Sequence, residues 1–284
     1  MPNSRRSGSS SASGSLVHRE YSVCSAATGC VPLLVHGAKL RKSNVTGAGT
    51  MLVIFNINNT SMKQLQNVWF ITLLLSSIAG YCDTATFVAA DRIFSAHVTG
   101  NFIVFAYQMV NFTDVYSWVK LITLPVFIIS VISGGWIVSK TADRYLLLLS
   151  EGVLLLFSGL AAVLYQMYSH SVWMMYTVVM FVVFAMGLQN AFGKLFSKET
   201  HGPTTMMTGN VTQAALDIGN LYRLKFKDAS TKLSLKKNVA TVGGFLAGCL
   251  VGAILAKRTG LCAIMLPGIL LVLYYVSRRG KHLA

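Results

Sequence analysis

The chain has 284 residues, of which 54% are hydrophobic and only 12% are charged. Because an average soluble domain carries roughly a quarter of charged residues, this composition excludes an ordinary soluble enzyme and indicates that a lipid bilayer is the solvent. Lys and Arg outnumber Asp and Glu by 24 to 9, which gives a net charge of +15. These bases lie between apolar runs and not on an aromatic-rich stripe, so we expect them to set membrane orientation and expect no nucleic-acid partner.

Residues 1–61 differ from the rest because they are rich in Ser, Gly and Arg and poor in apolar side chains. We predict that they are disordered, since they lack the apolar mass to fold alone. Two interpretations stay open: a transit peptide, or a dispensable tail or extension ahead of a natural start at Met62. The first would favour a mitochondrial membrane, and the second a plasma or inner membrane, which we prefer.

Apolar runs about long enough to cross ~30 Å of hydrocarbon begin at Val68. Two shorter segments, 102–110 and 211–219, fit either re-entrant half-helices or shielded spans of an eight-span protein. The sequence therefore predicts an all-α, polytopic transmembrane bundle over residues 62–284. The six clear spans are 68–90, 121–138, 145–165, 172–192, 240–256 and 261–276.

An internal repeat is indicated by ordered matches between about 66–168 and about 171–280. The strings AHVTGN and TTMMTGN share Thr-Gly-Asn, and a Gly-Tyr-Cys-Asp string upstream of the first parallels Gly-Leu-Gln-Asn upstream of the second. Downstream, Gly-Gly then Ser-Lys parallels the glycine-rich helix that ends in Ala-Lys. The matching positions are 99–101 with 208–210, 80–83 with 187–190, and 134–140 with the helix ending at 257.

The positive-inside rule favours six spans over eight. With six, most basic loops fall on one side, and the turn around Ser169, which has no Lys or Arg, falls on the other. The residues left on the wrong side are Arg92, Lys120, Lys257 and Arg258. Three spans per repeat would invert the second copy, an architecture found in many secondary transporters.

Asp83 is the sharpest candidate for chemistry, because a charged carboxylate within an apolar span is costly and should face a cavity, a partner or a proton. A protonated Asp83 that ties two helices together is the structural alternative. His97 is a candidate proton relay for Asp83, or only a polar boundary residue. In the second copy, Gln189 and Asn190 stand in place of the acid, as neutral hydrogen-bonding groups.

The Thr-Gly-Asn strings contain glycines that would let the backbone turn sharply before a helix. The paired helix starts could bind a polar or anionic solute, or the Thr residues could act only as N-caps. The six residues of these strings are Thr99, Gly100, Asn101, Thr208, Gly209 and Asn210.

Three other features are given structural or open interpretations. Gly244, Gly248 and Gly252 form a small-residue stripe that predicts close helix packing. Asp217 is either a second intramembrane polar site or a sign of an interfacial segment. Glu151 lies about two turns into a span, so we expect it to reach polar surroundings.

No metal site or cofactor is expected. The five cysteines form no C-x-x-C pair and no zinc spacing, and the chain has no phosphate loop, dinucleotide fingerprint, nucleophile elbow or HExxH string. The sequence therefore gives no support to an enzyme.

The strings GYCDTATFVAADRIFSAHVTGNF, GLQNAF and TTMMTGN resemble the YoaK-type family of bacterial multi-pass membrane proteins, from about Met62 to the C-terminus. The resemblance implies Met where Val98 stands and a basic pair that is reduced here to Lys194. It supplies a membrane fold and no reaction. The family pattern implies Asp83, His97, Thr99, Gly100 and Asn101 in the first copy, and Gln189, Asn190, Thr204, Thr205, Met207, Thr208, Gly209 and Asn210 in the second.

These observations favour a small secondary transporter or permease for a small polar or anionic solute. A non-transporting membrane scaffold or assembly factor is the main alternative, and a membrane-embedded enzyme comes third. The expected partner is the lipid bilayer, and a homo-oligomer is compatible with the glycine stripe.

Overall fold

The computed structural model describes residues 21–25, 29–33, 47–111, 115–141, 143–168, 171–197, 199–200 and 202–283, with side chains described between Gln66 and Arg279. By its internal contacts the chain divides into two units, Met1–Asn56 and Ile57–Ala284.

The first unit contains a two-stranded antiparallel hairpin of β1 (Tyr21–Ser25) and β2 (Gly29–Leu33), followed by the start of helix α1 (Gly47–Ala89). The disorder expected for residues 1–61 falls partly on residues outside the described ones. That expectation stays a prediction, while the two strands depart from an all-α chain. Val23 pairs with Val31 in this hairpin, and β-branched residues favour strands, a signal that the low overall apolar content concealed.

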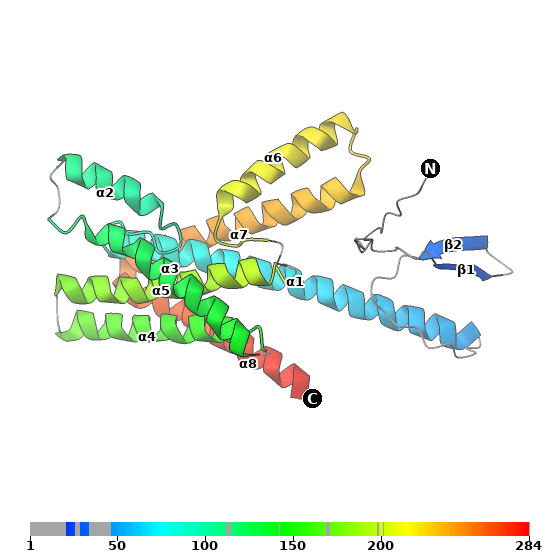
Figure 1. Cartoon of the computed structure of the whole chain (residues 1–284), viewed down its shortest axis with the longest axis horizontal. Helices are drawn as coiled ribbons and strands as arrows, with labels where there is room; N and C mark the ends of the chain where they lie inside the picture. The colour runs from blue at the N-terminus through cyan, green and yellow to red at the C-terminus, as the bar shows by residue number, and fades with distance from the viewer. Residues whose placement is uncertain are drawn as a thin grey trace, which may run out of the picture. The chain divides into compact units, whose positions relative to one another are not determined.

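The regular elements in the described part of the second unit are helices (Figure 1). The two short apolar segments of the sequence became separate helices, α2 and α6, of 12 and 17 residues. The elements after α1 are α2 (Gly100–Asn111), α3 (Val119–Lys140), α4 (Leu146–Tyr168), α5 (Val172–Leu195), α6 (Met207–Arg223), α7 (Ala229–Thr259), the 3-10 helix η1 (Gly260–Ile264) and α8 (Met265–Leu283).

Five described stretches are long and apolar enough to cross a membrane, so the protein is of the helical membrane type that the composition predicts. The fifth stretch, Ala229–Arg279, contains both α7 and α8, because only η1 separates them. The other four are Gln66–Ala89, Val119–Lys140, Leu146–Tyr168 and Val172–Leu195.

Helix α7 lies along α1 in the same direction, in contact through its glycines. A Cβ added at Gly244, Gly248 or Gly252 would collide with Ser76, with the Ser77 backbone or with the Tyr81 backbone, in that order. Small residues let two backbones approach this closely. The Ser77 hydroxyl uses the proximity to donate to the Gly244 carbonyl oxygen, at 3.0 Å.

Helices α3 and α5 form a second parallel pair. A Cβ added at Gly187 would lie 2.6 Å from the Ser130 Cβ, and one added at Gly134 would lie 2.8 Å from the Ala191 Cβ. The Ser130 hydroxyl donates to the Phe184 carbonyl oxygen across this contact. Both parallel pairs therefore depend on small residues at the crossing.

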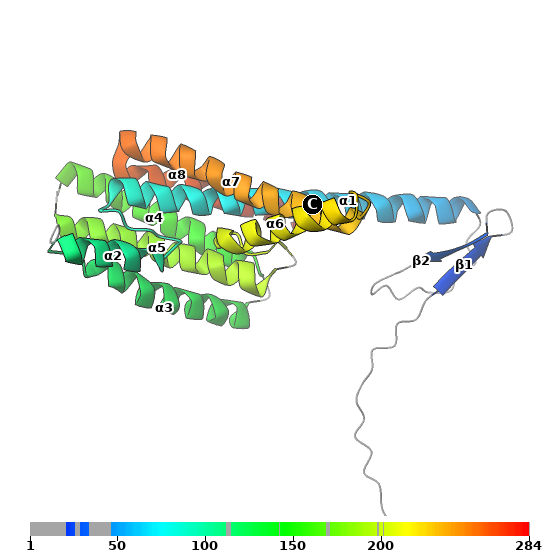
Figure 2. The ribbon, with the colours of Figure 1, turned by 90° about the horizontal axis from the view of Figure 1, so that it is seen from above.

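Helix α8 runs antiparallel to α1 and to α4 (Figure 2). Tyr81 donates to the Ala263 carbonyl oxygen at 2.8 Å, while the rings of Phe70 and Tyr274 stack at the other end. Against α4, Gly159 lies beside Met265 and Gly152 beside Leu271.

Helices α4 and α5 form an antiparallel hairpin. The ring pairs Phe157–Phe181 and Tyr145–Phe192 set its register. Buried side chains of α1, α4, α5 and α8 meet in one apolar cluster that includes Leu75, Leu155, Phe192 and Leu271. These helices are the framework that positions the polar groups described next.

Candidate functional site

Asp83 lies inside the bundle on α1 and is 4% exposed. Its Oδ1 accepts hydrogen bonds from the backbone N–H groups of Ala96 at 2.8 Å and His97 at 3.2 Å, and its Oδ2 lies 2.6 Å from His97 Nδ1. The carboxylate is therefore held by three groups of the connection that follows α1. Charge-assisted bonds of this kind are the strong ones in protein interiors.

The connection between α1 and α2 turns back along α1. Asp83 lies six residues before the end of α1 at Ala89, so the contact with residues 96–97 places the connection about 9 Å below the helix end, at 1.5 Å per residue. The reversal occurs at Asp91 and Arg92, whose φ angles of 48° and 57° are left-handed. The two residues that make the sharp turn are thus not glycines.

Asn101 closes this connection at its other end. Its side chain accepts from the Phe94 N–H at 2.8 Å, donates to the Phe94 carbonyl oxygen at 2.8 Å and donates to the Thr123 hydroxyl of α3 at 3.0 Å. Asn101 is fully buried. It therefore fixes the start of α2 to both the returning connection and α3.

The connection after α5 has a comparable layout with neutral groups. Gln189 donates to the Leu75 carbonyl oxygen of α1 at 2.7 Å and to the Thr204 hydroxyl at 3.0 Å. The Thr205 hydroxyl donates to Asn190 Oδ1 at 3.1 Å. Since α5 ends at Leu195, residues 204–205 have also returned along the preceding helix.

Asn210 repeats one contact of Asn101 at the same sequence separation. It donates to the Pro203 carbonyl oxygen, seven residues earlier, at 3.1 Å, just as Asn101 donates to Phe94. The Thr-Gly-Asn asparagines therefore brace the two returning connections. Met207, which the family resemblance also implied, is buried at the start of α6.

The glycines and threonines of the two strings do not act as the sequence analysis expected. Gly100 and Gly209 lie within the first turns of α2 and α6, and neither has a positive φ, so the sharp-turn expectation was wrong. Thr208 is inside α6 and exposed, so it is not a cap; the N-cap position of α6 is Met206, which makes no side-chain capping bond. Thr99 is exposed as well.

The start of α2 already uses its first N–H groups. Gly100, Asn101 and Phe102 donate to the carbonyl oxygens of residues 97–99 in 3-10 turns. These groups are not open to an anion in this conformation.

His97 connects Asp83 to α7. Its side chain is 36% exposed, and its ring meets the edge of the Phe245 ring with centroids 5.5 Å apart. His97 belongs to the connection between α1 and α2, outside the candidate spans, and its hydrogen bond to Asp83 raises its pKa, although burial acts in the opposite direction. This places a titratable pair at the point where the connection meets the helices.

A second buried ionic group was missed as a site by the sequence analysis. Lys120, at the start of α3, is fully buried and forms an ion pair with Asp91, which also accepts from Gln108 and Tyr176 at 3.2 Å each. Its charge is neutralised locally, which explains physically why Lys120 departs from the positive-inside pattern. The preceding turn residue Asp91 was the available signal.

Asp217 of α6 is 4% exposed and lies among neutral donors. It accepts from Gln213 at 2.8 Å, from Ser234 at 2.6 Å and from Asn238 at 3.5 Å. The acid therefore joins α6 to the start of α7.

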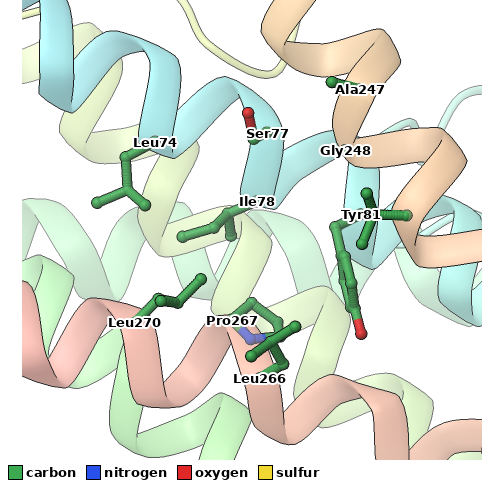
Figure 3. Close-up of a pocket in the computed structure, with 10 residues that line it drawn as sticks. Leu74, Ser77, Ile78, Tyr81, Ala247, Gly248, Leu266, Pro267 and Leu270 are labelled. Carbon is green, nitrogen blue, oxygen red and sulfur yellow. The ribbon is translucent and has the colours of Figure 1, made fainter. Parts of the chain in front are cut away.

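The apolar cavity in Figure 3, about 200 Å³ between α1, α7 and α8, is separate from these groups. Its polar side chains, Ser77 and Tyr81, already donate to backbone carbonyl oxygens. Asp83 does not line it. This cavity is therefore unsuited to a polar solute.

No group of three or more His, Cys, Asp or Glu side chains that could hold a metal ion occurs among the described residues. The candidate site thus consists of carboxylates, amides, hydroxyls and one imidazole.

A family model with the description "Protein of unknown function (DUF1275)" matches residues 71–277. The chain belongs to this family. The match with DUF1275 confirms the resemblance to YoaK-type membrane proteins and runs from α1 to α8, so it includes both returning connections. No curated protein and no solved structure matches the chain.

Proposed function

We propose that the protein is a small secondary transporter or permease for a small polar solute, in the plasma or inner membrane. The observation that carries this proposal is Asp83, an acid inside an apolar span held by the connection that turns back beside it. Intramembrane ionisable groups at interrupted helical segments are typical of substrate and ion pathways.

Helix directions support six spans in two inverted sets of three. The contacts above place α4 and α7 in the same direction as α1, and α3, α5 and α8 in the opposite one. Spans α1, α3 and α4 then run up, down and up, and spans α5, α7 and α8 run down, up and down. The short helices α2 and α6 belong to connections that return to the side from which they came.

A repeated cross-contact supports the internal duplication. A Cβ added at Gly80 of α1 would collide with the Phe245 carbonyl oxygen of α7, and one added at Gly187 of α5 would lie 3.2 Å from the Phe127 carbonyl oxygen of α3. The same two residue types therefore meet in both parallel pairs. This is the relation expected of two copies related by a two-fold axis in the membrane plane.

The basic residues agree with this orientation. The end of α3, the end of α5, the start of α7 and the end of α8 share one side of the bundle, and the positive-inside rule makes that side cytoplasmic. The end of α4 at Tyr168 lies on the opposite side. The basic residues concerned are Lys140, Arg144, Lys194, Arg223, Lys225, Lys227, Lys232, Lys236, Lys237, Arg278 and Arg279.

Topology is tested by labelling Ser171→Cys and Ser230→Cys, each in a cysteine-free background, with a membrane-impermeant maleimide on intact cells. Six spans predict that Ser171→Cys is labelled from outside and that Ser230→Cys is labelled only after permeabilisation. Labelling of both from the same side would support eight spans and parallel repeats instead.

Transport is tested by uptake of a panel of small polar and anionic solutes into proteoliposomes. We expect Asp83→Asn to reduce uptake at least tenfold, whereas Asp228→Asn, at the N-cap position of α7, leaves it unchanged. No solute taken up above empty liposomes, or uptake equal in the Asp83→Asn protein, would remove the proposed role.

The alternative function is a scaffold or assembly factor in which the same residues only pack helices. The glycine contact between α1 and α7 is the observation that favours it. In that case Asp83→Asn would leave cellular function intact, while Gly248→Leu would remove the protein from the membrane.

A further inference from the structure

Glu151 of α4 is a buried acid that the proposed pathway does not use. It is 0% exposed, and neither carboxyl oxygen has a hydrogen-bond partner among the residues that the structure describes. The expectation that it would reach polar surroundings was therefore wrong. The physical reason is the register of the helices, because α8 and α5 cover the part of α4 that carries Glu151.

The neighbours of Glu151 are apolar or neutral. On α4 itself it stands among the buried Leu147, Leu148 and Leu155. From α8, Leu271 packs against the adjacent Gly152, and the two tyrosines that follow it are engaged elsewhere: Tyr274 accepts from Arg278 and Tyr275 donates to Asp143. These contacts supply no donor for a carboxylate.

The two remaining faces are α1 and α5. Cys82 of α1 lies within electrostatic range of the Glu151 carboxyl, and its thiol is itself fully buried. The α4–α5 register places Gln189 within about one turn of Glu151, and Gln189 Oε1 is also buried without a partner among the described residues. Through Gln189, α5 thus offers the Glu151 carboxyl an acceptor, and not a donor or a cation.

Cations lie at the helix ends. Arg144, the basic residue nearest to Glu151 along the chain, pairs with Glu199. An ionised Glu151 would therefore be a buried charge without counter-ion or hydrogen bond, the most unfavourable arrangement for an acid. The neutral, protonated form has no such penalty, and its O–H needs only an acceptor.

We propose that Glu151 is a proton-binding site, and that H⁺ bound there is the coupling ion of the transporter. The proton would come from one aqueous side and leave to the other when α8 slides or separates from α4. Gly152, Gly159 and Gly268 give that interface the smooth, close contact that allows shear between packed helices. Coupling rests on the proposed transport function, but proton binding does not.

The contrast with Asp83 supports this division of roles. Asp83 has two backbone donors and a histidine around it, which suit a carboxylate. Glu151 has none. Two acids in such unlike surroundings are suited to different tasks in one site.

Infrared spectroscopy of the protein in liposomes tests proton binding without a known solute. We expect the C=O band of a protonated carboxylic acid at neutral pH, lost as the pH rises, absent at neutral pH in Glu151→Gln and retained in Asp83→Asn. Isotope-labelled glutamate in the unmutated protein provides a second assignment, because the chain has only three Glu residues, Glu20, Glu151 and Glu199.

Several results would overturn the proposal. One is the absence of a glutamate acid band at neutral pH, which would mean that Glu151 is ionised. Another is a band that does not change at any pH, which would mean a locked structural proton. Loss of the band on adding Na⁺ at constant pH would make the site a cation site instead. Failure to find a transported solute leaves this titration unaffected, so the two proposals can fail separately.

Discussion

The connections after α1 and after α5 follow similar backbone paths with different chemistry. The first uses a carboxylate, Asp83, bonded to backbone N–H groups and to His97, and the second uses Asn190 bonded to the Thr205 hydroxyl. Nearby, the buried Lys120 is paired with Asp91 in the first half, whereas the buried Asp217 of the second half accepts from neutral donors among the residues that the structure describes.

This comparison indicates that closing a returning connection does not require charge. An amide and a hydroxyl hold the second connection, and asparagines brace both. The buried charges of the first half therefore exceed what the fold needs. Burying an ion costs free energy that a neutral group would avoid. Buried charges that the fold does not require are expected at sites selected for function.

The largest predicted effect concerns the buried cation. Asp91→Asn leaves Lys120 buried with its charge no longer neutralised by that acid, and breaking a buried pair in this way costs about 3–5 kcal/mol. Asp217→Asn removes a charge that only neutral groups contact, and we expect about 1 kcal/mol. Thermal unfolding in detergent, followed by fluorescence-detected size exclusion, measures both.

The control is the double variant Asp91→Asn with Lys120→Met, which removes both charges and should recover most of the lost stability. Equal losses for Asp91→Asn and Asp217→Asn would contradict the difference between the two halves.

Much of the fold could be predicted from the sequence because hydrocarbon imposes length and apolarity on every span. The predicted runs 68–90, 121–138, 145–165 and 172–192 fall within stretches that the structure makes helical, apart from one or two residues at their ends. The two short helices were also predicted, since their apolar runs are too short for ~30 Å. The pairing of Asp83 with His97 follows from the expectation that a buried acid needs a partner.

Other features depend on three-dimensional contacts that a pattern does not contain. The glycines of the Thr-Gly-Asn strings were expected to make sharp turns, but Asp91 and Arg92 have the left-handed φ angles of the first connection. Glu151 was expected to reach polar surroundings, but helix packing covers it completely. In both cases the sequence shows which residues are unusual, while the neighbours decide what they do.

The next prediction compares the two parallel helix pairs, α1 with α7 and α3 with α5. Gly80→Ala places a methyl group against the Phe245 backbone, which cannot move away cheaply, whereas Gly187→Ala meets mainly the Ser130 side chain. We expect losses of about 3 kcal/mol and about 1–2 kcal/mol, within the range for overpacking. Gly243→Ala and Gly135→Ala, where no atom lies within 4 Å, are matched controls expected to change stability little. A larger loss for Gly187→Ala would contradict this ranking.

Exchanging the polar groups of the two connections gives a smaller effect. Asn190→Asp puts a charge at a position where, among the described residues, the Thr205 hydroxyl is the side-chain donor. We expect the free energy of unfolding to fall by about 2 kcal/mol. Asp83→Asn keeps an acceptor for the Ala96 N–H and should cost only about 1 kcal/mol. Thermal unfolding checks both, with Asn220→Asp on the exposed face of α6 as the control for added charge. The reverse order would show that charge is tolerated in the second half and would weaken the asymmetry argued above.

The smallest predicted effect compares the starts of α3 and α7. The N-cap residue of α3, Trp118, makes no side-chain capping bond, whereas Asp228 caps α7 by accepting from the N–H groups of Ser230 and Thr231.

Hydrogen bonds from the side chains of Thr231 and Ser230 lower the pKa of Asp228. Because the folded-state pKa is depressed, the stabilisation by the charge is present above the unfolded-state pKa and is lost as the pH falls through the folded-state pKa. The thermal midpoint of the unmutated protein should therefore exceed that of Asp228→Asn at neutral pH, by an amount that shrinks to zero in acid. Trp118→Asn, by contrast, should not raise the midpoint, because residue 118 has helical φ and ψ angles of −61° and −24° and the N–H groups of residues 119–121 already donate to the carbonyl oxygens of residues 116–118. Its effect should show no acid dependence, because an amide does not titrate.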